Sequence, residues 1–244
     1  MKNKKKKFHI GTSGWQYKHW KKIFYPEKLP QKKWFEFYSE NFSTVEVNYS
    51  FYRWPDEKKV QNWYEKAPKN FQFTLKAPRV ITHYKKLVNV EDYVKNLYKL
   101  GDILKEKMGC FLFQMPPNFT HKKHNLNKLQ NFLKILDNKK KNVIEFRDKS
   151  WWKKEIYDLL KKYKVTFCIT SGLKVPEDIV TTSNVRYYRF HGENYSSKYS
   201  KAQIKKYANT IKNNNNETYA YFNNDNKGHA INNAKELKRE LENA

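Results

Sequence analysis

The stretch Asn142-Val-Ile-Glu-Phe-Arg-Asp-Lys-Ser-Trp151 decides the fold class. Its apolar half predicts a buried strand that ends on Glu145 and Arg147, and Ser150 is the candidate cap of a helix that follows. A carboxylate and a guanidinium at the end of a buried strand are costly unless they are paired. The stretch therefore indicates a βα unit whose strand ends in a polar site.

Seven other stretches share this strand-like character and recur along the whole chain. With the first, they are Phe8 to Ser13, Thr44 to Asn48, Phe71 to Ala77, Gly109 to Met115, Asn142 to Arg147, Val165 to Thr170, Val185 to His191 and Thr218 to Asn224. Apolar stripes with helical spacing separate most of them, as between Val60 and Ala67. The segment from Ser171 to Asn184 is too short for a full helix, so we expect a loop or a single turn there.

This alternation of strands and helices predicts an α/β fold with a parallel sheet covered by helices. Eight βα units without a Pro/Gly/Ser linker predict one (β/α)8 TIM-barrel-like domain over residues 8–244, with a degenerate sixth crossover. Residues 1–7 are predicted to be a basic, disordered tail. A doubly wound sheet is the alternative, but Gly11-Thr-Ser-Gly-Trp15 lacks the G-x-G-x-x-G spacing of its phosphate loop.

The charge balance of the chain is strongly basic. Lys and Arg number 50 against 24 Asp and Glu, which gives a formal net charge of +26. Such a balance is typical of proteins that bind nucleic acid. The basic residues are spread along the chain, however, and accompany dense Asn, as in Asn213 to Asn216, which an AT-rich coding sequence produces. We therefore favour compositional drift and keep non-specific nucleic-acid binding as an alternative.

The two cysteines and the hydropathy pattern indicate the cellular compartment of the protein. Cys110 and Cys168 lie in strand-like stretches without metal-ligand spacing, so both are predicted to be buried free thiols. This favours a reducing, cytoplasmic location. No apolar stretch approaches the roughly 18 residues of a membrane span, and no signal sequence precedes the first strand. We therefore expect no membrane partner.

Polar side chains gather where the predicted strands end. Because the βα loops form one face of a barrel, these side chains are expected to share its mouth. As catalytic residues we predict Glu46 or Glu145 as a base and His191 as an acid. The predicted substrate-binding residues are Ser13, Trp15, Asn48, Lys76, His83, Arg147, Arg189, Asn223 and Asn224.

These residue types suit several functions. Two Arg and one Lys in one mouth favour recognition of phosphate or carboxylate. The leading hypothesis is therefore a protein that binds an anionic, phosphorylated small molecule or nucleotide. If Glu46 or Glu145 acts as a base, the protein would also hydrolyse this ligand. A metal-dependent phosphodiesterase or nuclease is an alternative, and a divalent metal stays open as a cofactor although no ligand motif indicates one. The simplest alternative is that Glu46 and Glu145 pair with Arg147 and Arg189 as a structural ion network.

At these residues the chain resembles the domain of unknown function 72 family, also called YecE-like. The matching segments run in order along most of the sequence: Gly11 to Trp15, Phe24 to Pro26, Thr44 to Asn48, Ser50 to Tyr52, Phe73 to Pro78, Ile81 to His83, Phe113 to Pro117, Ile144 to Arg147, Ser150-Trp151, Tyr188 to Gly192, Tyr199-Ser200, and Tyr221 to Asn224 with Ala230 and Asn233.

The resemblance implies a TIM-barrel-like fold with a polar cavity at the carboxyl ends of the strands and no settled activity. The recurrent polar positions of the family correspond here to Glu46, Asn48, Lys76, His83, Glu145, Arg147, Arg189, His191 and Asn223. Members often end the sixth strand on an acidic residue, where this chain has Thr170-Ser171. The fold is also broadly similar to those of endonuclease IV and xylose isomerase, an analogy that by itself implies no function.

Overall fold

The structure, a computed structural model, describes residues 8–242. Its strands are β1 (Phe8–Thr12), β2 (Thr44–Val47), β3 (Gln72–Lys76), β4 (Met108–Gln114), β5 (Asn142–Glu145), β6 (Thr166–Phe167), β7 (Ile169–Ser171), β8 (Val185–Phe190) and β9 (Glu217–Phe222). Its α-helices are α1 (Trp34–Asn41), α2 (Tyr49–Tyr52), α3 (Glu57–Lys66), α4 (Glu91–Ile103), α5 (Lys123–Ile135), α6 (Lys154–Lys162), α7 (Lys201–Lys212) and α8 (His229–Glu242). The predicted tail, residues 1–7, lies outside the described residues.

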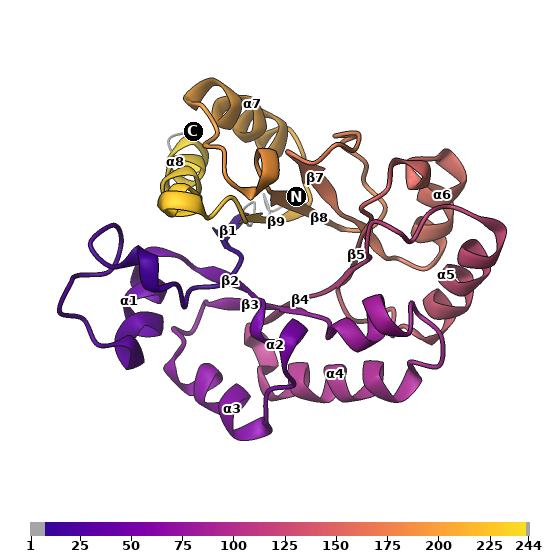
Figure 1. Cartoon of the computed structure of the whole chain (residues 1–244), viewed down its shortest axis with the longest axis horizontal. Coiled ribbons are helices and arrows are strands. Elements are labelled where there is room, and N and C mark those ends of the chain that lie inside the picture. Colours follow the sequence, from indigo (N-terminus) through magenta and orange to yellow (C-terminus); the bar gives the residue numbers. More distant parts are fainter. Residues whose placement is uncertain (1–7, 243–244) are drawn as a thin grey trace, which may run out of the picture.

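The strands pair in parallel and form two sheets, in the orders β1-β9-β8-β7 and β2-β3-β4-β5-β6. The sheets meet at two seams. At the first, Ser13 forms a parallel bridge with Glu46, and the Gly14 amide donates to the Glu46 carbonyl at 2.8 Å. The strands thus curve around a common centre with most of the helices outside them, in the TIM-barrel-like arrangement predicted (Figure 1).

The second seam lies within the predicted sixth strand. The structure divides this strand into β6 and β7, with only Cys168 between them. The Cys168 amide still donates to the Ile144 carbonyl of β5 at 2.9 Å, whereas Ile169 already pairs with Tyr188 of β8. One extended segment therefore changes neighbour from one sheet to the other. As predicted, the crossover that follows, residues 172–184, contains no helix.

The interior of the ring is packed. A cluster of buried side chains fills it: Cys110, Leu112, Val143, Cys168, Val185, Tyr187, Tyr219 and Tyr221. The Tyr221 hydroxyl on β9 reaches across to the hydroxyls of Thr44 on β2, at 2.6 Å, and Thr74 on β3, at 2.9 Å. The ring thus encloses a core rather than a pore. Cys110 and Cys168 are both buried and free, which confirms the prediction.

Side chains along one strand show how this interior becomes polar. Alternate residues of a strand face the same side. On β8, Val185, Tyr187 and Arg189 therefore face the interior. Their side chains change from apolar at Val185 to charged at Arg189, near the carboxyl end of the strand. The site described below occupies this polar end.

Two serines near helix starts, Ser200 and Ser150, have different roles in the structure. Ser200 caps α7 with a capping box, because its hydroxyl accepts from the Gln203 amide and the Gln203 side chain accepts from the Ser200 amide. Ser150 does not cap a long helix, and that prediction is wrong. It lies in a 3₁₀ turn, Lys149–Trp151, which is capped by Asp148, and α6 begins only at Lys154. The Ser150 hydroxyl instead accepts the His121 amide at 2.8 Å.

Within residues 8–242, no helix is both long enough and apolar enough to cross a membrane.

Candidate functional site

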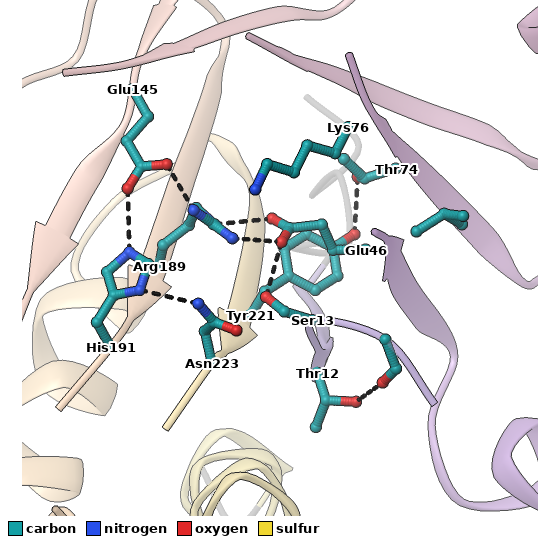
Figure 2. Close-up of polar contacts among 12 residues, drawn as sticks. Thr12, Ser13, Glu46, Thr74, Lys76, Glu145, Arg189, His191, Tyr221 and Asn223 are labelled. Carbon is teal, nitrogen blue, oxygen red and sulfur yellow. Dashed lines mark hydrogen bonds and ion pairs between the residues drawn. The ribbon is translucent and has the colours of Figure 1, made fainter. Parts of the chain in front are cut away.

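Glu46 is fully buried at the carboxyl end of β2 and is held by four hydrogen bonds (Figure 2). Arg189 from β8 donates twice, from Nε to Oε2 at 3.0 Å and from Nη2 to Oε1 at 2.7 Å. The Ser13 hydroxyl donates to Oε1 at 2.7 Å, and the Tyr187 hydroxyl donates to Oε2 at 2.6 Å. This carboxylate therefore has no oxygen left without a partner.

Glu145, at the end of β5, is bound just as fully. Arg189 donates from Nη1 to its Oε2 at 2.5 Å, and Arg147 Nε lies 2.7 Å from its Oε1. The Nε2 atom of His191 is 3.0 Å from the same Oε1. Two carboxylates and two guanidiniums thus form a cluster of no net charge, called here the charge cluster: Glu46, Glu145, Arg147 and Arg189.

The pKa shifts follow from burial and from these neighbours. Burial raises the pKa of each carboxyl group, but the guanidiniums outweigh it. The pKa of Glu46 is lowered chiefly by Arg189, and that of Glu145 is held well below its ordinary value by Arg147 and Arg189. Both glutamates are therefore ionised and strongly paired. This arrangement does not favour the predicted role of either as a general base.

His191 is a neutral imidazole with both nitrogens engaged. Burial lowers its pKa to about 3, and the nearby guanidiniums act in the same direction. Because ionised Glu145 only accepts hydrogen bonds, the ring proton resides on Nε2. The Nδ1 atom then accepts from Asn223 Nδ2 at 3.1 Å (Figure 2). His191 is better suited to orienting Glu145 and Asn223 than to the predicted role of an acid.

A pocket of ≈ 530 Å³ opens beside the charge cluster. It brings together four of the predicted binding residues, Lys76, His83, Arg147 and Asn223. The rest of the lining consists of Tyr17, Phe51, Tyr52, Gln114, Pro117, Tyr195, Asp225 and Asn226. The wall of this pocket is thus cationic and aromatic.

Lys76, at the end of β3, is the cation of this wall without a counter-ion. Its Nζ lies 4.0 Å from the centre of the Phe51 ring. Among residues 8–242, no carboxylate or other acceptor lies within ion-pair or hydrogen-bond distance of that nitrogen, and no dashed line reaches it in Figure 2. Burial, reinforced by Arg189, lowers the pKa of Lys76 to about 7. Because the charge cluster is already neutral, a proton on Lys76 is a surplus positive charge.

His83 lines the pocket together with Lys76, whereas the predicted binding residue Asn48 does not. The His83 ring stands edge-on to Phe51, with the centres 5.0 Å apart, and its Nδ1 is 2.8 Å from the Thr82 hydroxyl. Burial lowers the pKa of His83 to about 4, so it is neutral at pH 7. Asn48 follows β2, and its buried Oδ1 has no hydrogen-bond partner within the described part of the chain.

Two predicted binding residues lie away from the pocket. Trp15 is buried in the core, where its ring packs edge-on against Phe35 and Trp63. Asn224 is buried as well, and its amide donates to Asn233 Oδ1 at 3.1 Å. Both side chains therefore stabilise the loops around the site rather than line it. Ser13 and Arg189 also lie beneath the pocket, in contact with Glu46.

Within residues 8–242, no three His, Cys, Asp or Glu side chains are grouped as the ligands of a metal ion are.

A known protein family matches almost the whole chain. Residues 9–244 match the family described as "Protein of unknown function DUF72". The chain belongs to this family. The UPF0759 protein YunF of Bacillus subtilis is 24% identical over 94% of this chain and 93% of its own length. The UPF0759 protein YecE of Escherichia coli K12 is 26% identical over 46% of this chain and 38% of its own length.

A solved DUF72 structure supports the fold as well. The crystal structure of a DUF72 family protein from Thermotoga maritima matches with a TM-score of 0.88 and 28% identity, and the match covers 97% of this chain and 99% of that one. The resemblance seen in the motifs and the TIM-barrel-like fold are therefore both confirmed. None of these descriptions states an activity.

One departure from the expected DUF72 pattern finds a structural explanation. Strand β7 ends on Ser171, where the resemblance led us to expect an acidic residue. Glu177, from the crossover after β7, accepts from the Ser171 hydroxyl at 2.8 Å and from the Gly172 amide at 3.1 Å. A carboxylate thus reaches this strand end from the loop instead of the strand.

Tyr195 is one of the residues of this DUF72 pocket that sequence reasoning missed. It lies in the loop after β8, and its hydroxyl accepts a hydrogen bond from Arg147 Nη1. Asp225, which follows β9, also lines the pocket. Burial raises the pKa of Asp225 to about 6 although Trp20 donates to it at 2.6 Å. Asp225 was detectable as a strand-end residue, whereas Tyr195 had no such signal.

The lowered pKa of Lys76 predicts a pH-dependent stability for this DUF72 protein. Between about pH 7 and 10 the unfolded chain binds the Lys76 proton and the folded chain does not, so this residue makes stability rise with pH by up to about 1.4 kcal/mol per pH unit. We expect Lys76→Met to remove this slope. Urea unfolding of both proteins at pH 7, 8 and 9 measures it.

The exposed Lys201 provides the control for that experiment. Lys201→Met should keep the slope of the wild-type protein. Equal slopes in the wild-type protein and Lys76→Met would show that Lys76 is ordinarily charged in the folded state.

Proposed function

We propose that this protein binds an anionic small molecule, such as a phosphorylated metabolite or a nucleotide, in the pocket lined by Lys76 and Arg147. One observation carries the proposal: the charge cluster is neutral in itself, and Lys76 adds a cation without a counter-ion. An anionic ligand would supply that counter-ion.

Arg147 supports this proposal through its fixed orientation. Its Nε is paired with Glu145, and its Nη1 donates to Tyr195. A guanidinium held in this way presents its remaining N–H groups in a fixed geometry, which favours recognition of phosphate or carboxylate. Because two of its contacts are already made, little side-chain entropy is lost when a ligand binds.

Aromatic side chains favour a ligand that also carries a ring. Tyr17, Phe51 and Tyr52 line the pocket together with Tyr195. Tyr52 is 69% exposed and Tyr195 is 42% exposed, so both rings have free surface at the pocket. Ring faces of this kind stack on bases and on sugars. A phosphorylated nucleoside or sugar fits both features.

Hydrolysis receives less support than binding. The pKa of Glu46 and of Glu145 is lowered, and both carboxylates are saturated by their neighbours, so neither is poised to take a proton from water. The metal-dependent nuclease would need ligands that are not already paired with arginine. We therefore propose binding as the function.

The proposal is tested with Arg147→Gln and AMP as the probe. Loss of a charge-assisted contact with phosphate should weaken binding of AMP by about 1.5–3 kcal/mol, a factor of roughly 10 to 150 in Kd. Isothermal titration calorimetry at fixed ionic strength measures this change. Adenosine, which lacks the phosphate, should bind weakly to both proteins.

Arg79→Gln is the matched control, because Arg79 is exposed and lies outside the pocket. The substitution removes the same positive charge as Arg147→Gln does. It should bind AMP as the wild-type protein does. If Arg147→Gln and Arg79→Gln weaken AMP binding equally, the affinity arises from the overall basic charge, and a steep dependence on salt should accompany it.

A further inference from the structure

The structure contains two buried lysines in contrasting surroundings. Lys107 is 6% exposed, and its Nζ donates to the carbonyls of Tyr64 at 2.7 Å and Ala67 at 2.6 Å. Lys76 is 8% exposed, yet its Nζ has no such acceptor within the described residues and faces the pocket. Lys107 therefore has the environment of a structural ammonium group, whereas Lys76 has that of a reactive amine.

We propose that Lys76 forms an imine with a carbonyl group of the ligand, so that the pocket takes an aldehyde or ketone that also carries phosphate or carboxylate. This inference rests on the proposed function, since Arg147 would hold the anionic group while Lys76 meets the carbonyl. It adds the chemical class of the ligand and a covalent step.

The charges around Lys76 support a neutral amine. Arg147 and Arg189 oppose its protonation, and the carboxylates that would favour it, Glu46 and Glu145, are committed to those arginines. The contact with Phe51 favours the ammonium form, but burial outweighs it, since the pKa of Lys76 falls to about 7. The neutral form of Lys76 is thus far more abundant at pH 7 than that of an exposed lysine, which is roughly one in a few thousand.

The chemistry requires no oxidant or reductant. The lone pair of Nζ attacks the carbonyl carbon, a C–N bond forms, and the carbonyl π pair moves to oxygen. One proton passes from nitrogen to that oxygen, and the carbinolamine then loses hydroxide with the second N–H proton as one water, leaving C=N. His83, neutral and in the same wall, is placed to carry the proton between nitrogen and oxygen.

Trapping with borohydride tests the proposal on the full-length protein. The probes are pyridoxal 5′-phosphate, an aldehyde that carries phosphate, and pyridoxal, which lacks it. Sodium borohydride adds hydride to the imine carbon and gives a secondary amine that survives digestion, so peptide mass spectrometry locates it. At pH 7 we expect Lys76 to be modified by pyridoxal 5′-phosphate at least tenfold more than the exposed Lys201, with Lys107 unmodified.

Arg147→Gln separates the two proposals. It should lower labelling of Lys76 by pyridoxal 5′-phosphate about tenfold and leave labelling by pyridoxal within about twofold, because the anionic contact is lost and the amine remains. Labelling by pyridoxal also controls for any change in the protonation of Lys76. In Lys76→Met, incorporation of the phosphate probe should fall by one equivalent.

Each other outcome contradicts one proposal or both. If Lys76 is modified no more than Lys201 while AMP binding still depends on Arg147, the imine is excluded and anion binding stands. If both aldehydes modify Lys76 equally, the amine is reactive but the pocket does not recognise the anion. If neither enrichment nor Arg147-dependent binding is found, both proposals are wrong.

Discussion

Arg189→Met should lower the free energy of unfolding by about 3–5 kcal/mol, because it leaves two buried carboxylates without their shared counter-ion. Arg189 is 1% exposed and makes three hydrogen bonds to Glu46 and Glu145. Both carboxylates are fully buried, so bulk solvent does not replace these hydrogen bonds. Urea denaturation followed by circular dichroism at pH 7 measures the loss.

Arg186, on the same strand, supplies the control. Its Nε donates to the Thr181 hydroxyl at 2.7 Å, and it pairs with no buried carboxylate within residues 8–242, so Arg186→Met should cost about 1 kcal/mol or less. Should Arg189→Met be too unstable to purify, the triple variant with Glu46→Gln and Glu145→Gln should recover much of the stability. A loss of under 1 kcal/mol in Arg189→Met alone would mean that the cluster is not held by Arg189.

Gly11→Ala should lower the free energy of unfolding by about 3 kcal/mol, which is the upper end of the cost of overpacking a core. A Cβ atom on Gly11 would lie 2.2 Å from the Thr44 carbonyl oxygen, where at least about 3 Å is needed. That oxygen belongs to β2 and cannot rotate away, so β1 and β2 must separate at the first seam. Chemical denaturation measures the loss.

Ile10→Val is the comparison for that variant, because it removes one buried methyl group from the same strand and should cost only about 0.5–1.5 kcal/mol. Hydrogen exchange provides a second readout. The Gly14 amide, which donates to Glu46 across the seam, should lose protection in Gly11→Ala and keep it in Ile10→Val. Equal protection would mean that the seam tolerates the added methyl group.

Much of the fold was predictable because strand periodicity and helical stripes are local signals. The predicted sixth strand shows the limit of these local signals. Val165 to Thr170 is one apolar run in sequence, but Cys168 divides it because its two ends pair with different neighbours. Pairing partners are set by the closure of the ring, which the run itself does not encode. Helix α1 was missed because its buried residues, Trp34, Phe35 and Tyr38, make too short a stripe.

The candidate site was predictable to the level of strand ends. Arg147 and Arg189 both end a strand, and the sequence gives them equal weight. In the structure Arg147 lines the pocket, whereas Arg189 lies between two carboxylates beneath it. This difference depends on which side chains meet across the ring. Trp15 was predicted at the mouth for the same reason, yet its ring turns outward to pack on Phe35.

The order in which the chain supplies the strands of the two sheets affects how the protein folds during its synthesis on the ribosome. All strands of the five-stranded sheet, from Thr44 to Phe167, are made before β8 and its Arg189. Until then Glu46 and Glu145 have no Arg189 to neutralise them, so we expect a nascent half-barrel to keep both carboxylates hydrated rather than close prematurely. Strand β1 waits longest, since its partner β9 is made last. Arrival of the C-terminal half would then dehydrate the glutamates, and the barrel would close in a single late step.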